Sequence, residues 1–262
     1  KKLVDALKAR KVYARWAQRK PARFDYNMVV IGAGSAGLVS AYIAAATKAK
    51  VALVEKHRMG GDCLNTGCVP SKALIRSAKF LSHVARSREF GIDAASAQFD
   101  FAQVMERVQR VVAAIEPHDS VERYSALGVE CVAGTATISS PWTVEVVTEQ
   151  ARAAVSEASI TALVQPIPTP APPLEGEGRQ RRVLRTRNIV IAAGARPFVP
   201  PIPGLAEIGY LTSDTVWSLR ARPRRLLVLG GGPIGCELTQ AFARLGCEVT
   251  QVEMAPRLML RE

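Results

Sequence analysis

The chain has 262 residues, 48% of them hydrophobic, which suits one large or two medium domains with real cores and argues against global disorder. No apolar run reaches the roughly 18 to 20 residues that span a bilayer, and the basic start lacks the apolar stretch of a signal peptide. The net charge of +12 is concentrated in residues 1–24, with nine Lys or Arg and one acid, so no nucleic-acid-binding core is expected.

Residues 1–24 are expected to be a basic extension or linker, with an amphipathic helix that ends before Pro21. Two interpretations stay open for it: a solvated linker helix, or a segment that lies beside a membrane surface. A buried strand at 26–31, a glycine turn, a helix at 38–47 and a strand at 51–55 are expected next. Helices are then expected at 69–88 and 100–128, the second kinked or broken at Pro117.

The pattern after residue 128 changes to short strands. A small antiparallel β layer is expected at 129–132, 135–138 and 142–147. Residues 165–182 contain five prolines and two glycines and are expected to be a loop insert that carries no chemistry. Strands are expected again at 183–184, 188–192 and 226–229, the last opening a second strand–turn–helix–strand. Because the chain lacks a starting Met and stops just after that unit, we interpret it as a piece of a longer polypeptide.

Two glycine turns form an internal repeat, Gly32-Ala33-Gly34-Ser35-Ala36-Gly37 and Gly230-Gly231-Gly232-Pro233-Ile234-Gly235. Each is followed by an acid, Glu55 or Glu253, that lies 23 positions after the first glycine and closes an apolar strand. The first glycine permits a tight turn, the second lets the backbone approach a pyrophosphate, and the third lets helix and strand pack closely. The helix N-terminus attracts phosphate, and the carboxylate binds a ribose. Two such units indicate electron transfer between two bound dinucleotides.

The five cysteines are too sparse for a secreted disulfide framework and indicate a reducing compartment. Cys63 and Cys68 stand directly after the first unit, in Gly60-Gly61-Asp62-Cys63-Leu64-Asn65-Thr66-Gly67-Cys68-Val69-Pro70-Ser71-Lys72. A reversible disulfide is favoured over a zinc site, which would need a second Cys/His pair, and over two structural thiols. Because Pro70 suits a first helical turn, Cys68 is expected near a helix N-terminus, which favours the thiolate. The other cysteines are expected to be inert core residues: Cys131, Cys236 and Cys247.

These motifs resemble the pyridine nucleotide-disulfide oxidoreductases with an active-site Cys-x4-Cys, which include dihydrolipoamide dehydrogenase, glutathione reductase and mercuric reductase. The resemblance covers about residues 25–262 apart from the insert. It implies an α/β fold with a Rossmann-like FAD-binding domain at 25–212 that carries a small β layer. An incomplete Rossmann-like NAD(P)-binding domain follows at 213–262, and the family's C-terminal dimerisation domain is absent. FAD is expected on the first glycine unit and a nicotinamide nucleotide on the second.

The resemblance also implies roles for single residues. Cys63 would be the interchange thiol that meets substrate, and Cys68 the charge-transfer thiol beside the flavin. Lys72 and Glu237 match an ion pair beside the flavin, with ordinary helix-surface roles as the alternative. Residues 186–197 match a segment that returns to FAD, although Ala193 stands where the family often has Thr. No metal site is expected. The expected cofactor-binding residues are Gly32, Gly34, Ser35, Gly37, Glu55, Lys56, Gly61, Asp62, Ala193, Gly194, Gly230, Gly232, Ile234, Gly235 and Glu253.

The implied activity passes electrons, in either direction, between a nicotinamide nucleotide, FAD and the Cys63–Cys68 disulfide. The acceptor would be a disulfide or dithiol substrate, with Hg(II) as an open alternative. Glu253 favours NAD(H) over NADP(H), because a carboxylate repels the extra phosphate, and the nearby Arg257 weakens that preference. The full-length protein is expected to be a cytoplasmic homodimer, whereas the chain alone is expected to turn over slowly, if at all.

The N-terminal run into residues 26–30 also resembles bacterial proteins in which this enzyme follows an integral membrane domain. That resemblance would place the protein at the cytoplasmic face of the inner membrane. It also supplies the alternative function, a non-catalytic FAD- and nucleotide-binding module that senses redox state and is attached to a membrane partner.

Overall fold

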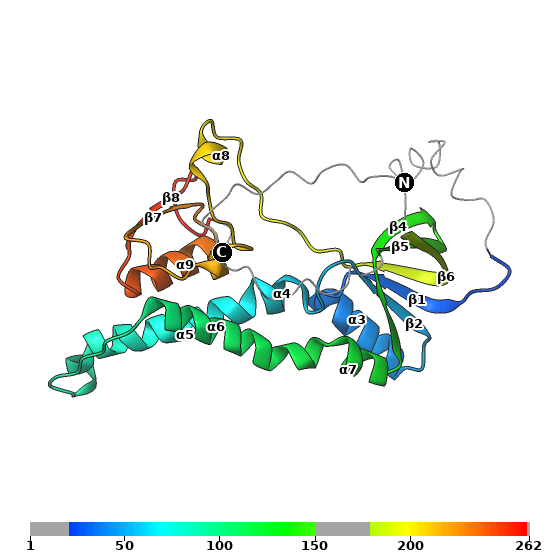
Figure 1. Cartoon of the computed structure of the whole chain (residues 1–262), viewed down its shortest axis with the longest axis horizontal. Coiled ribbons are helices and arrows are strands. Elements are labelled where there is room, and N and C mark those ends of the chain that lie inside the picture. Colours follow the sequence, from blue (N-terminus) through cyan, green and yellow to red (C-terminus); the bar gives the residue numbers. More distant parts are fainter. Residues whose placement is uncertain (1–20, 150–178, 261–262) are drawn as a thin grey trace. The chain divides into compact units, whose positions relative to one another are not determined.

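The computed structural model describes residues 21–149 and 179–260, which form two compact units (Figure 1). The first unit comprises the described residues up to 61 with 118–195 and 202–209, and the second comprises 62–117, 196–201 and the residues from 210 onward. The helix expected within residues 1–20 and the insert up to residue 178 lie outside the described residues. Within the described part of the chain, no helix is long and apolar enough to cross a membrane.

A six-stranded sheet forms the first unit, in the order β3-β2-β1-β6-β5-β4. Strands β1 (Tyr26–Ile31), β2 (Val51–Glu55) and β3 (Val129–Ala133) pair in parallel, and α3 (Ser35–Ala46) connects β1 to β2. Strand β2 is apolar without alternation because both of its faces are covered, and residues 51–54 are all buried. Val30 packs on the α3 side and Val29 on the side of the antiparallel strands, and both are fully buried.

Strand β6 (Arg179–Ile191) changes partner along its length. Its first half pairs antiparallel with β5 (Thr143–Glu149), which also pairs with β4 (Thr135–Ser140), and its second half pairs in parallel with β1. The expected insert at 165–182 was therefore wrong at its end, because residues 179–182 are strand. Although residues 179–182 are basic, their backbone groups pair with strand β5. The register of this pairing is set by the buried residues Val144 and Leu184, which lie opposite each other. The strands expected at 183–184 and 188–192 are likewise one continuous strand.

Strand β3 corrects a second expectation. The sequence predicts that it belongs to the antiparallel layer, yet it extends the parallel part of the sheet beside β2, with Val51 opposite Val129. The reason is the preceding helix α7 (Val121–Ala126), which brings the chain back over the sheet, as a crossover to a parallel strand requires. The antiparallel layer therefore consists of β4, β5 and the first half of β6.

Proline 117 breaks the long helix expected at 100–128. Helix α6 (Phe101–Ile115) ends before it, the short turn η2 (Glu116–Asp119) contains it, and α7 begins after Ser120. Both helices begin at side-chain caps. The Asp100 carboxylate accepts from the Ala102 N–H at 2.8 Å, and the Ser120 hydroxyl accepts from the Arg123 N–H at 3.2 Å. The break lets α6 and α7 belong to different compact units.

The second unit contains α4 (Gly61–Asn65), α5 (Cys68–Ala85), α6 and the short turns η1 (Ser87–Phe90) and η3 (Val216–Ser218). It also contains strand β7 (Arg225–Leu229), helix α9 (Pro233–Arg244) and strand β8 (Glu248–Val252), which form a two-stranded parallel βαβ unit. The remaining short helix, α8 (Leu205–Ile208), belongs to the first unit. The second strand–turn–helix–strand expected from the sequence is thus present.

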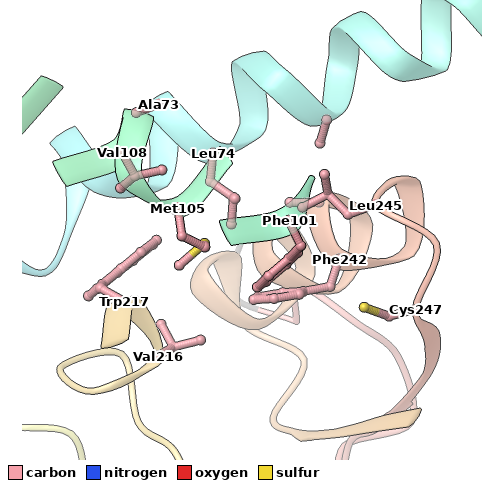
Figure 2. Packing of buried hydrophobic residues seen from close by; sticks show 12 residues of the cluster. Ala73, Leu74, Phe101, Met105, Val108, Val216, Trp217, Phe242, Leu245 and Cys247 are labelled. Atoms are coloured by element: carbon pink, nitrogen blue, oxygen red, sulfur yellow. The ribbon is translucent and has the colours of Figure 1, made fainter. Parts of the chain in front are cut away.

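The core of the second unit joins α6 and α5, which begins at Cys68, to this βαβ unit. Figure 2 shows Leu74 of α5 and Phe101 and Met105 of α6 gathered with Trp217 and Phe242. The rings of Phe101 and Phe242 lie 6.3 Å apart between centroids. Burial of this apolar cluster explains why residues 62–117 group with residues after 210, a division that differs from the boundary expected at residue 212.

Candidate redox and nucleotide-binding sites

The first glycine turn follows β1 and is too tightly packed for side chains at two of its glycines. A Cβ at Gly32, whose φ is +101°, would stand 2.2 Å from the carbonyl oxygen of Ala192, and one at Gly37 would stand 1.8 Å from that of Gly32. At Gly34 the Cα of Gly61, at 3.7 Å, is the only atom of the described residues that a Cβ would meet. The first and third glycines therefore serve the turn and its packing, and the middle position is the one open to a ligand.

The N-terminus of α3 is the part of this turn that can hold phosphate. Its N-cap residue is Gly34, no side chain among the described residues caps it, and its first turn contains no acid. The exposed Ser35 is the first helical residue. N–H groups at such a helix start point toward an anion and are favoured by the helix dipole. The turn therefore fits the pyrophosphate of a dinucleotide.

Three segments converge on this turn at one edge of the sheet. Gly61, with φ +54°, approaches so closely that a Cβ on it would stand 2.5 Å from the Cα of Gly34, and the N–H of Gly60 donates to the carbonyl of Ala33 at 2.9 Å. Ala193 and Gly194 follow the end of β6, which pairs with the end of β1. The exposed Lys56 follows β2. The cofactor-binding residues expected in the first unit are thus gathered at the carboxyl ends of β1, β2 and β6.

Glu55 and Glu253 make equivalent hydrogen bonds in the two glycine turns. The Glu55 carboxylate accepts from the N–H of Ala33 at 2.7 Å and of His57 at 2.8 Å. The Glu253 carboxylate accepts from the N–H of Gly231 and, at 2.8 Å, of Ala255. Both acids therefore fix their turns, and because a carboxylate has about four acceptor positions, each keeps room for a ribose hydroxyl. The ribose contact itself stays a prediction.

The hydrogen bonds from Ala255 and Gly231 also lower the pKa of Glu253 below its ordinary value, so this side chain carries a negative charge at neutral pH. The charge lies at the end of β8, where the expected adenosine ribose would stand. A negative charge is therefore fixed at the end of β8.

The second glycine turn repeats the first at its middle and third glycines, whereas no described atom lies within 4 Å of a Cβ position at Gly230. A Cβ at Gly235 would stand 2.3 Å from the carbonyl oxygen of Gly230, whereas no described atom lies within 4 Å of a Cβ position at Gly232. Gly232 is the N-cap of α9, with Pro233 at the helix start and the exposed Ile234 next. The N–H of Met259 donates to the carbonyl of Gly231 at 2.8 Å, so the segment after β8 folds back onto this turn. This unit also fits a dinucleotide.

Cys63 and Cys68 lie at the two ends of a short closed loop. Cys63 is half-buried in α4, and the exposed Cys68 is the first residue of α5, which confirms the expected position at a helix N-terminus. The exposed Asp62 closes the loop with its carbonyl, which accepts from the N–H of Thr66 at 2.9 Å and of Gly67 at 2.5 Å. A Cβ at Gly67 would stand 2.9 Å from that carbonyl oxygen and 3.6 Å from the Cα of Cys63. Glycine at 67 thus lets the backbone of the two cysteine-bearing turns meet.

Lys72 and Glu237 form the ion pair expected from the sequence. The Lys72 ammonium lies 2.7 Å from one carboxylate oxygen of Glu237 and 2.6 Å from the other. Lys72 stands one helical turn after Cys68 on α5, and Glu237 lies on α9, which packs against α5. The contact is confirmed, and its role beside a flavin stays a prediction.

Trp217 is a site residue that the sequence analysis missed. Its indole N–H donates to the carbonyl of Thr66, inside the cysteine loop, at 2.8 Å, and to that of Ser213 at 2.7 Å. Its side chain is 5% exposed and belongs to the core of the second unit. The only signal in the sequence was a lone tryptophan in the polar run 212–218, which does not reveal what its N–H contacts.

The remaining cysteines lie away from this loop in sequence and differ in surroundings. Burial raises the pKa of the Cys131 and Cys247 thiols, which keeps them protonated, as expected of inert core residues. Cys236 instead lies against the second glycine turn, with its sulfur 3.4 Å from the carbonyl oxygen of Gly231. It is therefore not an ordinary apolar core residue.

The family model described as pyridine nucleotide-disulphide oxidoreductase matches residues 26–262. The chain belongs to this family of flavoprotein oxidoreductases. The first glycine turn and the Rossmann-like sheet of the first unit are accordingly those of a FAD-binding fold, and family members use FAD with a nicotinamide nucleotide.

Similar proteins include mercuric reductases, dihydrolipoyl dehydrogenases and a flavoprotein disulfide reductase. The chain is 34% identical over 237 residues to a mercuric reductase of Bacillus cereus, across 90% of the chain and 32% of that protein. It is 34% identical over 247 residues to a dihydrolipoyl dehydrogenase of Chlorobaculum parvum, across 94% of the chain and 46% of that protein. A Cu(II) complex of a mutant of the HOCl-induced flavoprotein disulfide reductase RclA from Escherichia coli superposes with a TM-score of 0.67 at 26% identity, across 92% of the chain and 45% of that structure. The chain thus spans less than half the length of each of these proteins.

Proposed function

We propose that the full-length protein is a FAD-dependent oxidoreductase that passes electrons between a nicotinamide nucleotide and the Cys63–Cys68 pair, and from there to a disulfide or metal-ion acceptor. The contact of Gly61 with Gly34 carries this proposal. It brings the chain onto the phosphate-binding turn, and Cys63 follows only two residues later. Consecutive Cα atoms lie about 3.8 Å apart, so the cysteine loop begins close to the ligand that the glycine turn would bind.

The cofactors fit the residues that would hold them. The turn from Gly32 to Gly37, with Glu55, would hold FAD, and the turn from Gly230 to Gly235, with Glu253, would hold the nicotinamide nucleotide. In both turns the middle glycine leaves space where a Cβ would otherwise stand. When bound, the flavin would supply two-electron transfer between the nicotinamide nucleotide and the cysteine pair.

The cysteine loop would perform the disulfide chemistry. Two electrons and two protons convert the Cys63–Cys68 disulfide into two thiols. Cys63, as thiolate, then attacks an acceptor disulfide, forms a mixed disulfide and releases one acceptor thiol. Cys68 attacks Cys63 in turn, which releases the second acceptor thiol and restores the disulfide. The position of Cys68 at the start of α5 and its exposure support a role as the resolving residue.

The Lys72–Glu237 pair would steady charge beside this chemistry. Both carboxylate oxygens of Glu237 lie within hydrogen-bond distance of the Lys72 ammonium, so the ammonium is held one helical turn from Cys68. A positive group fixed in this place stabilises negative charge that develops during electron transfer and costs no reorganisation at that moment.

NAD(H) is the proposed nucleotide. Glu253 is ionised at neutral pH, and a carboxylate at the ribose position repels the additional phosphate of NADP(H). Arg257, which lies four residues further on, is the side chain that would weaken this discrimination.

The acceptor is proposed only by class, as a small-molecule or protein disulfide or as Hg(II), because the relatives include both dihydrolipoyl dehydrogenases and mercuric reductases. A homodimeric, cytoplasmic assembly stays a prediction from the family resemblance. Neither the described structure nor the relatives support a membrane partner. The alternative of a non-catalytic redox-sensing module finds no specific supporting observation.

Anaerobic titration of the full-length protein with NADH tests the proposal. Alkylation and mass spectrometry should detect two additional thiols, at Cys63 and Cys68, for each NADH consumed. A Cys68→Ser variant should bind FAD yet lose both this gain and disulfide reduction. Reduction without any gain of thiols at the two positions would refute the electron route. Lipoamide, glutathione disulfide and Hg(II), assayed in parallel, identify the acceptor.

A further inference from the structure

We infer that Trp217 is a positioning residue for the Cys63–Cys68 pair and that its indole N–H helps to set the disulfide–dithiol equilibrium. The inference rests on the proposed function, because it assumes that the two cysteines form a redox couple. It concerns a side chain about 150 residues further along the chain, in a segment with no recognisable redox motif.

Thr66 is held through both of its backbone groups. Its N–H donates to the carbonyl of Asp62 at 2.9 Å, which closes the α4 turn, and its carbonyl accepts from the Trp217 indole at 2.8 Å. Thr66 lies three residues after Cys63 and two before Cys68. The indole thus restrains the middle of the segment whose two ends would be joined by the disulfide.

The 212–219 turn, which carries the indole, is itself restrained by hydrogen bonds. The same N–H also donates to the carbonyl of Ser213 at 2.7 Å, a three-centre arrangement that ties the cysteine loop to the start of the 212–219 turn. Within that turn the Thr215 hydroxyl accepts from the N–H of Thr212 at 2.9 Å. The carbonyl of Trp217 accepts from the Arg220 guanidinium at 3.1 Å.

Packing fixes the indole ring as well. Trp217 lies in the core of the second unit with Met105 and Val108 of α6, as Figure 2 shows. Its neighbour Val216 belongs to the same core and is 6% exposed. Because α5, which begins at Cys68, contributes Ala73 and Leu74 to this core, the indole and Cys68 are attached to one packed body. The indole can therefore act as a fixed clamp on Thr66.

A fixed loop changes the redox equilibrium through the cost of closing the disulfide. Disulfide formation requires the two Cα atoms to come within about 4.4 to 6.8 Å in a restricted geometry. A loop already held near that geometry loses less conformational freedom on closure than a loose one. Removal of the N–H should therefore destabilise the disulfide relative to the dithiol, and the couple should become more oxidising.

The test is a comparison of Trp217→Phe with the wild type in the full-length protein. Each is equilibrated in glutathione redox buffers, the thiols are trapped by alkylation, and the oxidised fraction at Cys63 and Cys68 is counted by mass spectrometry. The equilibrium constant for disulfide formation should fall about three- to tenfold, which corresponds to a potential about 15 to 30 mV more positive for a two-electron couple. A constant equal to that of the wild type overturns the inference.

Val216→Ala is the matched control, because it removes buried side-chain volume from the same turn and leaves the indole hydrogen bond to Thr66 in place. It should lower thermal stability without shifting the redox equilibrium. If Val216→Ala shifts the equilibrium as much as Trp217→Phe does, the effect belongs to core packing and the inference fails.

A second measurement needs no destabilising variant. The full-length protein is labelled with 5-fluorotryptophan, which places fluorine on Trp217 and on Trp16 and Trp142 of the same chain. The Trp217 resonance is assigned by its absence in Trp217→Phe or, if that variant does not fold, in Trp217→Tyr. It should shift between the oxidised and reduced states, whereas the Trp142 resonance, assigned by its absence in Trp142→Phe, should not. An unchanged Trp217 resonance overturns the inference. If the wild-type cysteines form no disulfide in any buffer, the proposed function fails first, and the inference fails with it.

Discussion

Lys72 and Glu237 lie 165 residues apart in sequence, yet their charged groups meet at 2.6 and 2.7 Å across the contact of α5 with α9. The pair is open to water, with side-chain exposures of 60% and 42%, and exposed ion pairs contribute at most about 1 kcal/mol to stability. The pair therefore contributes little to folding, and its role in the chemistry near Cys68 stays a prediction.

Lys72→Met should accordingly separate function from stability. We expect a change of less than about 1 kcal/mol in the free energy of unfolding, and at least a tenfold fall in the rate at which NADH generates thiols at Cys63 and Cys68. Stopped-flow mixing followed by acid quench and alkylation measures the rate. Arg86→Gln, which breaks the exposed Arg86–Glu89 pair on the same chain, is the control and should leave the rate unchanged. Equal rates in the Lys72 variant and the wild type would leave the pair a surface ion pair.

Gly34→Ala and Gly37→Ala should differ in what they damage. The alanine Cβ at 34 would make an ordinary contact of 3.7 Å, whereas at 37 it would stand 1.8 Å from the Gly32 carbonyl oxygen. Gly34→Ala should therefore keep the melting temperature of the apoprotein and lose at least tenfold in FAD affinity. Gly37→Ala should lower the melting temperature itself. Calorimetry and bound-flavin absorbance measure both, and normal FAD binding by Gly34→Ala would place the cofactor elsewhere.

Glu253→Gln should weaken the preference for NADH. The neutral amide removes the negative charge and offers a donor where the N–H groups of Gly231 and Ala255 need acceptors. We expect KM for NADH to rise about tenfold and the ratio of kcat/KM for NADH over NADPH to fall by a similar factor. If NADPH is already the better donor for the wild type, the role assigned to Glu253 is wrong.

The same carboxylate gives a pH dependence of known sign. Its pKa is lowered in the folded protein, so its bonds to the turn are present above the ordinary glutamate pKa of about 4.5 and are lost as pH falls through the lower folded value. NADH affinity measured by fluorescence titration should therefore stay constant from neutral pH down to about pH 5. A titration centred near pH 6 would show that another group controls binding.

Tyr26 should make the first unit sensitive to alkali. Burial, followed by its hydrogen bond to Glu130 at 2.7 Å, raises the pKa of Tyr26 from 10 to about 12. Because the folded pKa lies above the unfolded one, this contribution is complete below pH 10 and is lost as pH rises toward 12. Denaturant unfolding should show a loss of up to about 2 to 3 kcal/mol over this range. Tyr26→Phe should lower the free energy of unfolding at neutral pH and reduce its dependence on pH in this range. If the pH dependence of the variant equals that of the wild type, other groups cause the alkaline sensitivity.

Thiol reactivity should follow exposure. Cys68 is exposed, whereas Cys247 is buried and burial raises the pKa of its thiol. Brief treatment of the reduced protein with iodoacetamide should label Cys68 at least tenfold faster than Cys247, as counted by peptide mass spectrometry. Comparable labelling of both in the folded protein would mean that the second unit opens readily in solution.

The local order of elements could be predicted from the sequence because it depends on local rules. Residues 26–31 and 51–55 form the expected strands because their apolar runs suit burial on both faces, and Pro117 ends α6 because proline lacks an N–H and clashes with the preceding turn. The two glycine turns were identifiable because backbone strain and close packing restrict those positions to glycine. The Cys-x4-Cys segment was identifiable because its chemistry depends on spacing along the chain.

Partners that lie far apart in sequence were decided by the tertiary structure alone. Strand β6 passes from β5 to β1 without interruption, and β3 joins the parallel edge, because free backbone groups pair with whichever neighbour the fold supplies. The grouping of α5 and α6 with the second glycine unit follows from the burial of apolar area. Burial does not depend on spacing along the chain, so a sequence pattern does not reveal it. The Trp217 indole reaches Thr66 for the same reason: a directional hydrogen bond forms only after packing has brought donor and acceptor together. The sequence thus determined the elements and the chemistry they carry, and the tertiary structure decided which residues hold that chemistry in place.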